Sequence, residues 1–225
     1  MNNFKLAPSD FGFLWDECKR CFWLKVRGGF PRPSTPFPGI FTHIDLRMKD
    51  YYQGRRTEEI GGAPPAGTIE FGEKWVESAP IALEGLASTC YIRGKFDTVL
   101  KLDDGSWSVA DFKTSRVAPG SAAKYGRQLH AYALALEHAA PRKFALAPVS
   151  RLGLMVFEPS AYGHDEPAKA TLTGPMTWLE IPRDDAGFRR FLAEVVTLLE
   201  SDRAPEPGEK CVFCRYREES RARGV

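Results

Sequence analysis

GKFDTVLKLDDGSWSVADFKTS, residues 94–115, alternates apolar and polar side chains on either side of the turn-forming run KLDDG. This pattern predicts two antiparallel strands joined by a tight turn. Because side chains alternate across a strand, Asp111 and Lys113 share one face, whereas Ala110 and Phe112 share the other. A buried carboxylate or ammonium group costs free energy unless it is paired or binds a metal. These charges therefore either lie on a solvated face or are gathered for a chemical purpose.

The length of the turn decides whether Asp97 joins that face. A two-residue turn places Asp97 opposite Phe112. A three-residue turn over residues 103–105 places it opposite Asp111 instead and puts Gly105 at a positive φ, which glycine adopts readily. We expect the three-residue turn, with the two carboxylates within about 6 Å of each other, since directly opposed Cβ atoms lie roughly 4.5–5.5 Å apart.

Two close carboxylates repel each other, and a divalent cation relieves that repulsion. Oxygen ligands of this kind suit Mg²⁺ or Mn²⁺. A lysine beside such an ion can hold an attacking water and stabilise developing negative charge. The alternative is a solvated hairpin face with an incidental D-x-K, and the triplet alone does not exclude it.

A helix predicted over residues 121–140 follows the hairpin after a short loop. Its polar residues Lys124, Gln128 and Tyr132 recur every four positions and form one stripe. Its apolar residues form another stripe, which is suited to packing on a sheet: Leu129, Ala133 and Leu136. A polar stripe is more often a solvent face, but its position directly after the D-x-K strand favours a second wall of the same site.

Four of the five cysteines form two C-x-x-C pairs, Cys18 with Cys21 and Cys211 with Cys214. In a protein without a recognisable export signal, such pairs are more often metal ligands than disulfides. Cys211 lies 190 residues after Cys21, so a four-cysteine site would join distant parts of the chain, and bound metal would offset the entropy of closing that loop.

Segments 9–27 and 205–217 would together form this cysteine region. Four thiolates suit Zn²⁺ and an iron–sulfur cluster equally well on ligand type. The alternative without a metal is four buried thiols that act as small apolar residues. Cys90, without a partner in the β-region, is expected in the core.

The remaining pattern predicts a mixed α/β protein with the hairpin at its centre. The expected helices cover 9–27, 40–53, 121–140 and 187–201; the strands lie within 68–113 and at 151–157 and 176–181; loops cover 28–39 and 54–67.

The succession GKFDTVL, ADFKTS and QLHAY resembles motifs II and III and the Q-x-x-x-Y motif of the PD-(D/E)XK nuclease superfamily. It is most similar to the RecB-like branch, and there to the CRISPR-associated exonucleases that carry an iron–sulfur cluster. The resemblance runs from Cys18 to Cys214. It implies a restriction-endonuclease-like α/β core, which is a central mixed sheet with an antiparallel hairpin flanked by helices. A four-cysteine metal centre would join the N- and C-terminal segments.

The resemblance also implies roles for individual residues. Lys113 would be catalytic, and Gln128 and Tyr132 would organise the site or the DNA. Mg²⁺ or Mn²⁺ would be bound by four groups: His43, Asp97, Asp111 and the carbonyl of Phe112. Asp111 stands where many members have glutamate.

Two of these implied assignments leave alternatives open. His43 is included because PGIFTHID offers a G-x-x-x-H stretch, with Gly39 first, but an ordinary half-buried or capping histidine fits as well. Similar nucleases take one cysteine from the N-terminal side and three from the C-terminal side for a 4Fe–4S cluster. The two-plus-two split found in this sequence keeps zinc open.

Composition bounds the remaining expectations. The 225 residues are expected to form a single domain, and they are 43% hydrophobic and 27% charged. The net charge of +2 argues against a protein that binds nucleic acid through its overall charge alone. Local basic residues, Arg116, Lys124 and Arg127, are expected to hold the DNA backbone. No signal peptide or apolar membrane span is recognisable, so we expect a cytoplasmic protein.

The expected function is a metal-dependent deoxyribonuclease, an exonuclease in the first instance, acting on single-stranded DNA or duplex ends. The family resemblance favours a 4Fe–4S cluster, with Zn²⁺ as the alternative, at its four cysteines. Protein partners in recombination, DNA repair or CRISPR adaptation are conceivable. One alternative is an inactive nuclease-like protein that binds DNA or a partner and carries structural zinc. Another is an interaction module stabilised by zinc, in which the acidic hairpin is part of the solvent-exposed surface and has no catalytic role. Both aspartates and the lysine are present, which favours activity.

Overall fold

The structure is a computed structural model that describes residues 2–36, 38–116 and 120–224. Its larger sheet is mixed, as expected, and has five strands in the order β10-β7-β6-β5-β2. β6 pairs antiparallel with β5 and parallel with β7. The five strands are β2 (Gly67–Phe71), β5 (Thr98–Leu102), β6 (Trp107–Thr114), β7 (Val149–Phe157) and β10 (Met176–Ile181).

The predicted three-residue turn joins β5 to β6. The Leu102 N–H donates to the Ser106 carbonyl at 2.9 Å, and Gly105 has a φ of 86°. The register that follows pairs Thr98 with Ala110. The next position outward is Asp97 opposite Asp111, so the expected turn and its register are confirmed.

A second, three-stranded sheet has the order β1-β4-β3. Its strands are β1 (Asn3–Leu6), β3 (Lys74–Glu77) and β4 (Thr89–Phe96). The sequence pattern suggested one long strand through β4 and β5, and this is wrong: the chain bends at Asp97 and passes from one sheet into the other. The reason is a change of burial, since β4 buries every second residue whereas β5 buries four of its five.

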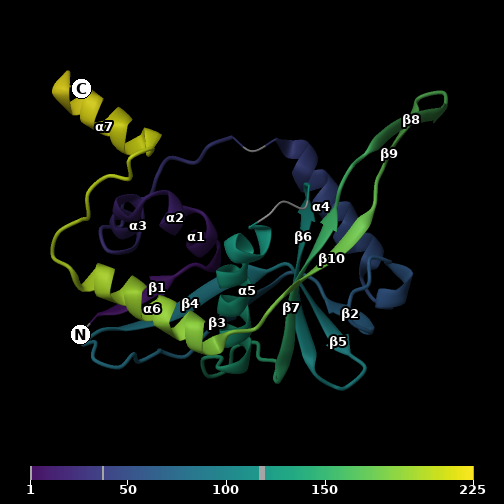
Figure 1. Ribbon diagram of the computed structural model, residues 1–225, viewed down its shortest axis with the longest axis horizontal. Helices are drawn as coiled ribbons and strands as arrows, with labels where there is room; N and C mark the ends of the chain where they lie inside the picture. The colour runs from purple at the N-terminus through teal and green to yellow at the C-terminus, as the bar shows by residue number, and fades with distance from the viewer. Residues whose placement is uncertain (1, 37, 117–119, 225) are drawn as a thin grey trace.

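Helices cover both faces of the five-stranded sheet (Figure 1). α5 (Ser121–Glu137) packs its predicted apolar stripe against the main core, in which Leu129 and Leu136 are fully buried. α4 (Gly39–Tyr52) covers the opposite face, where Met48 and Tyr52 pack against Phe112. α6 (Asp185–Glu200) adds six buried side chains to the α5 side.

The predicted helix over 9–27 is three short helices instead: α1 (Pro8–Gly12), α2 (Leu14–Glu17) and α3 (Lys19–Val26). Phe13 and Cys18 interrupt the helical backbone, Cys18 with an extended conformation (φ −164°, ψ 106°). The periodicity suggested a continuous helix because apolar residues recur on both sides of the two breaks.

Three further elements were not predicted: the short strand β1, the hairpin of β8 (Ala161–Glu166) and β9 (Lys169–Thr173), and α7 (Val212–Ala222). Figure 1 shows the β8–β9 hairpin projecting from the body of the protein. Residue 37 of the predicted loop and the ends of the predicted domain, residues 1 and 225, lie outside the described residues. Across the described part of the chain, no helix is both long and apolar enough to cross a membrane.

Candidate active site and metal centre

The carboxylates of the hairpin lie in a hollow of about 470 Å³ at an open edge of the five-stranded sheet. Pairing between β5 and β6 ends at Thr98 and Ala110, so within the described residues the end of β6 has no β5 partner. We call this space the carboxylate hollow. Its charged and amide or phenol side chains come from α4, β4, the β4–β5 bend, β6 and α5: Asp45, Lys95, Asp97, Asp111, Lys113, Gln128 and Tyr132.

Asp97 and Asp111 shift each other's pKa in opposite directions. Burial and the charge of Asp97 raise the pKa of Asp111 well above its usual range, although Lys113 opposes this shift. Burial also acts to raise the pKa of Asp97, but its interaction with Asp111 and the charges of Lys49 and Lys113 outweigh it and lower that pKa. The two carboxyl groups therefore lie close enough to interact, in keeping with the predicted turn.

Lys113 forms an ion pair with Oδ2 of Asp111. This oxygen is buried and makes no well-directed hydrogen bond to any described residue, so it keeps unused acceptor capacity. The Lys113 ammonium also lies 5.0 Å from the centre of the Tyr125 ring, within the range of a cation–π contact. The lysine is thus held at the rim of the hollow, where it can meet an incoming anion.

Gln128 and Tyr132 reach the hollow from α5, and both are buried. The Tyr132 hydroxyl donates to the Lys95 carbonyl at 2.7 Å. Burial and the nearby aspartates raise the pKa of Tyr132, so its hydroxyl stays protonated. Gly94 makes room for this side chain, because a Cβ there would lie only 3.1 Å from the Tyr132 ring.

Three charged residues of the site were missed by the sequence analysis: Asp45, Lys49 and Glu73. The Lys49 ammonium lies 2.7 Å from Asp45, 2.9 Å from Glu73 and 3.0 Å from Asp97. Asp45 and Lys49 are four positions apart on a helix, which is a visible signal, but such pairs are ordinary on helix surfaces.

His43, predicted as a metal ligand, is not brought to the carboxylates. It lines a different hollow beside Tyr51 and Leu172. Positions 43 and 45 differ by about 200° around an α-helix, so the helix that turns Asp45 toward Asp97 turns His43 away.

The three residues predicted to bind DNA occupy different surroundings. The side chain of Arg116 is 88% exposed. Lys124 is exposed one helical turn before Gln128 and is not part of the wall of the carboxylate hollow. Arg127 pairs with Asp16 at 2.7 Å and lines a separate hollow between α5 and α6. Arg116 also forms an ion pair, with Glu158 at 3.4 Å, so two of the three predicted DNA-binding residues, Arg116 and Arg127, already have a carboxylate partner.

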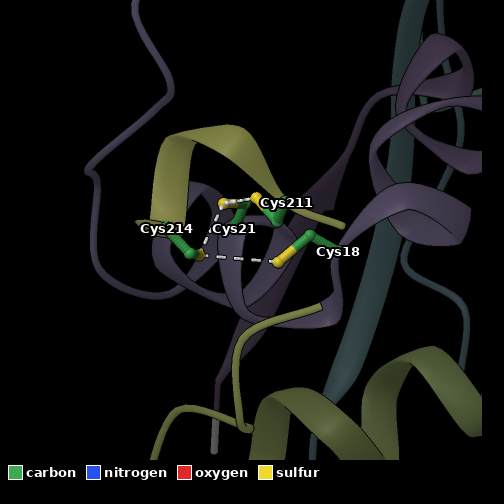
Figure 2. A group of neighbouring side chains, drawn as sticks. All are labelled: Cys18, Cys21, Cys211 and Cys214. Carbon is green, nitrogen blue, oxygen red and sulfur yellow. Dashed lines mark hydrogen bonds between the residues drawn. The ribbon is translucent and has the colours of Figure 1, made fainter. Parts of the chain in front are cut away.

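The four paired cysteines come together in space, and we call this group the cysteine centre. Figure 2 shows the sulfur atoms of Cys18, Cys21, Cys211 and Cys214 directed toward one another, from the junction of α2 and α3 and from the start of α7. Three Sγ–Sγ distances are 3.5–3.7 Å, and all four atoms lie within 4.8 Å of one another. All four side chains are buried.

Hydrogen-bond donors surround the cysteine centre. The Arg32 guanidinium donates to Cys211 Sγ at 3.2 Å, and the Gly208 N–H donates to Cys18 Sγ at 3.3 Å. Burial alone would raise the pKa of Cys18, but hydrogen bonds, from Gly208 and Cys21 above all, lower it to about 6. The centre is therefore arranged for at least one thiolate, the form of cysteine that binds metals.

The sulfur spacing is suited to a metal ion. Four ligands about 2.3 Å from one tetrahedral ion lie about 3.8 Å apart, which is close to the distances observed. Cys90, by contrast, is fully buried, and burial raises its pKa to about 12, which is consistent with the core position predicted for it.

Comparison with known proteins gives one family match. The family model of the PD-(D/E)XK nuclease superfamily matches residues 42–218, which include every charged residue that lines the carboxylate hollow. Among solved structures, the chain is similar to one titled "Crystal structure of SSO0001", with 17% sequence identity, a TM-score of 0.49 and coverage of 89% of this chain and 79% of that chain. No curated protein matches the chain significantly.

Proposed function

The chain belongs to the PD-(D/E)XK nuclease superfamily, and on that premise we propose that it hydrolyses phosphodiester bonds in DNA at the carboxylate hollow. The observation that carries the proposal is the convergence of Asp97 and Asp111 in one hollow beside Lys113. Two neighbouring carboxyl groups that disfavour each other's ionisation form a ready site for a divalent cation. The open edge of β6 leaves room there for a nucleic-acid backbone.

The residues present suit Mg²⁺ or Mn²⁺. Asp97, Asp111 and the Phe112 carbonyl would hold the ion, and the unused capacity of Asp111 Oδ2 supports this assignment. When bound, such an ion polarises a phosphate and makes water a better nucleophile. Binding requires that Asp111 release its proton, so we expect affinity for the ion to rise with pH.

The chain's own side chains would perform the rest of the chemistry. Lys113 would orient the attacking water and neutralise charge that develops on the phosphate. Gln128 and Tyr132 would fix the position of the substrate, because both are buried and Tyr132 is anchored to the Lys95 carbonyl. Arg116 and Lys124 would contact flanking phosphates from the exposed surface.

The finer parts of the proposal rest on the motif resemblance to RecB-like enzymes. They are action on DNA from an end, as an exonuclease, and a place among recombination, repair or CRISPR-adaptation proteins. For the cysteine centre, the sulfur spacing favours a single tetrahedral ion, and zinc is the ordinary choice. A 4Fe–4S cluster holds four iron atoms among the same four thiolates, and it would need them further apart.

The test is cleavage of labelled DNA by protein whose cysteine centre carries its metal. Single-stranded, double-stranded and covalently closed circular DNA would each be incubated with Mg²⁺, with Mn²⁺ or without added ion. We expect cleavage of linear DNA only when an ion is present, and no cutting by Asp111→Asn. Cutting of closed circles would replace the exonuclease by an endonuclease. DNA binding without any cleavage would favour the inactive, DNA-binding alternative.

A further inference from the structure

Lys49 is a buried charge that the proposed chemistry does not use. Its side chain is only 10% exposed, yet it carries an ammonium group. Three carboxylates surround that group at 2.7–3.0 Å: Asp45, Glu73 and Asp97. They come from three different parts of the chain, namely α4, the connection between β2 and β3, and the β4–β5 bend.

The surroundings of Lys49 match those of a bound cation. An ammonium group has three protons to donate, and each of the three carboxylates lies at hydrogen-bond distance. With all three protons taken, Lys49 has none to offer a phosphate.

The charges of the hollow divide into two parts that share Asp97. On the outer side, Lys49 and the half-exposed Lys95 neutralise Asp45 and Glu73. On the inner side, Lys113 is the one ammonium group that pairs with Asp111 among the described residues, and Asp111 Oδ2 keeps spare acceptor capacity. Two carboxylates there face one ammonium group, apart from the hydrogen bond that Asp97 accepts from Lys49, so the inner side is the one short of positive charge.

We propose that Lys49 is a fixed cation that takes the place of a second divalent metal ion, so that the nuclease centre binds one divalent ion, between Asp97 and Asp111. In two-metal nucleases the ions lie about 3.5–4 Å apart and share a carboxylate. Here Asp97 is the shared carboxylate, and Lys49 holds its outer oxygen. Lys49 is thus a positioning residue, which acts on substrate only through Asp97. This inference rests on the proposed nuclease function.

The competing role is a mechanical one, in which Lys49 merely holds α4 against the sheet. Both roles predict that a Lys49 variant loses activity, so activity cannot separate them. The number of bound ions can separate the two roles, because a residue that only holds α4 against the sheet would not change how many ions bind.

The experiment is to count Mn²⁺ ions bound to the full chain, with its cysteine centre loaded, by electron paramagnetic resonance. We expect one ion per wild-type chain. Lys49→Met keeps the apolar stem and removes the charge, and it should bind two ions with a spin-coupled signal. Lys49→Arg keeps the charge and should bind one. The matched control, Lys95→Met, removes a half-exposed lysine whose ion pair, among the described residues, is with Glu73, and it should also leave the count at one.

Two ions in the wild-type protein, or one in a folded Lys49→Met, would overturn the inference. Lys49→Gln serves as a second variant if Lys49→Met fails to fold, and the wild-type count tests the inference without any variant. DNA cleavage by a wild-type protein that binds two ions would reject the role of Lys49 and leave the nuclease intact. No Mn²⁺ binding and no cleavage would reject both.

Discussion

Asp97 faces Asp111 across the end of the β5–β6 hairpin, one position beyond the last pair of Thr98 with Ala110. Asp97 lies at the bend between β4 and β5 and Asp111 lies on β6, and they meet because the turn between β5 and β6 has three residues. The function of the pair should therefore change when either carboxylate is replaced, when the pH changes, or when the backbone of the turn is altered. Each of these dependences gives a prediction.

Asp97→Asn and Asp111→Asn should each lower cleavage at least about 100-fold, as expected when a charged group that acts on the transition state is removed. Removal of one carboxylate relieves repulsion, so the melting temperature without divalent ions should stay the same or rise. His43→Ala is the matched control, since His43 lines another hollow, and it should keep activity within a few-fold of wild type. Wild-type cutting by either aspartate variant would remove the carboxylates from the mechanism.

The stability of the metal-free hollow should depend on pH. An unfolded aspartate has a pKa of about 4, whereas burial and Asp97 raise the pKa of Asp111 in the folded protein. The folded state therefore binds more protons between these values. The stability from Asp111 is fully present at low pH and is lost as pH rises through its folded pKa. Asp111→Asn should flatten that part of a plot of melting temperature against pH, and parallel plots for the two proteins would contradict the raised pKa of Asp111.

Lys113→Met should leave binding of Mn²⁺ unchanged or slightly tighter while turnover falls by about 10²–10³-fold. The ammonium pairs with Asp111, so it competes with an ion for that oxygen, but it is placed to act on the substrate. Single-turnover cleavage and Mn²⁺ titration on the same preparation separate the two effects. If both fell together, Lys113 would be a structural partner of Asp111 and nothing more.

Gly105→Val should reduce cleavage although residue 105 is remote from the hollow. Its φ of 86° is one that a β-branched residue adopts only at a cost of about 1–3 kcal/mol. No atom lies within 4 Å of the position that a Cβ would take, so crowding is not the cause. Gly105→Asn tolerates positive φ and should behave like wild type. Equal activity of the two variants would show that the turn does not control the register at Asp97.

The cysteine centre should bind metal through all four thiols. Elemental analysis after anaerobic purification should give one zinc per chain, and colourless protein. Cys18→Ser or Cys214→Ser should lose the metal and lower the melting temperature, whereas Cys90→Ala, in the core, should keep the metal. Brown protein with about four irons per chain would establish the cluster instead. Metal-free wild-type protein, purified with metal supplied, would contradict the centre itself.

Local sequence patterns predict the parts of this protein that depend on nearby residues. The β5–β6 turn and the apolar stripe of α5 are of this kind, because a glycine at positive φ and a four-residue spacing are visible in the chain. The contacts of Lys49 are not, since Glu73 and Asp97 lie 24 and 48 residues away along the sequence. Without knowledge of how α4 docks on the sheet, Asp45 is one surface acid among many, and His43 is the more conspicuous candidate.

In the N-terminal region, a local sequence pattern predicted a regular element that the structure does not contain. Apolar periodicity suggested one helix, but Cys18 adopts an extended conformation there, and its thiol reaches residues almost 200 positions later. α7 was missed for a related reason, because it buries little besides Cys214 and so shows no strong apolar stripe. In both cases the local conformation accompanies a distant contact among thiols.

The separation of Cys18 from Cys214 by 196 residues also sets an order of events during synthesis. A ribosome adds about 5–20 residues per second, so Cys18 is synthesised roughly 10–40 seconds before Cys214. From their exit from the ribosome until that moment, Cys18 and Cys21 are free thiols on a nascent chain, open to oxidation or to capture of the wrong metal. Correct loading of the centre is therefore a late step that depends on the cell keeping these two thiols reduced while the rest of the protein is made.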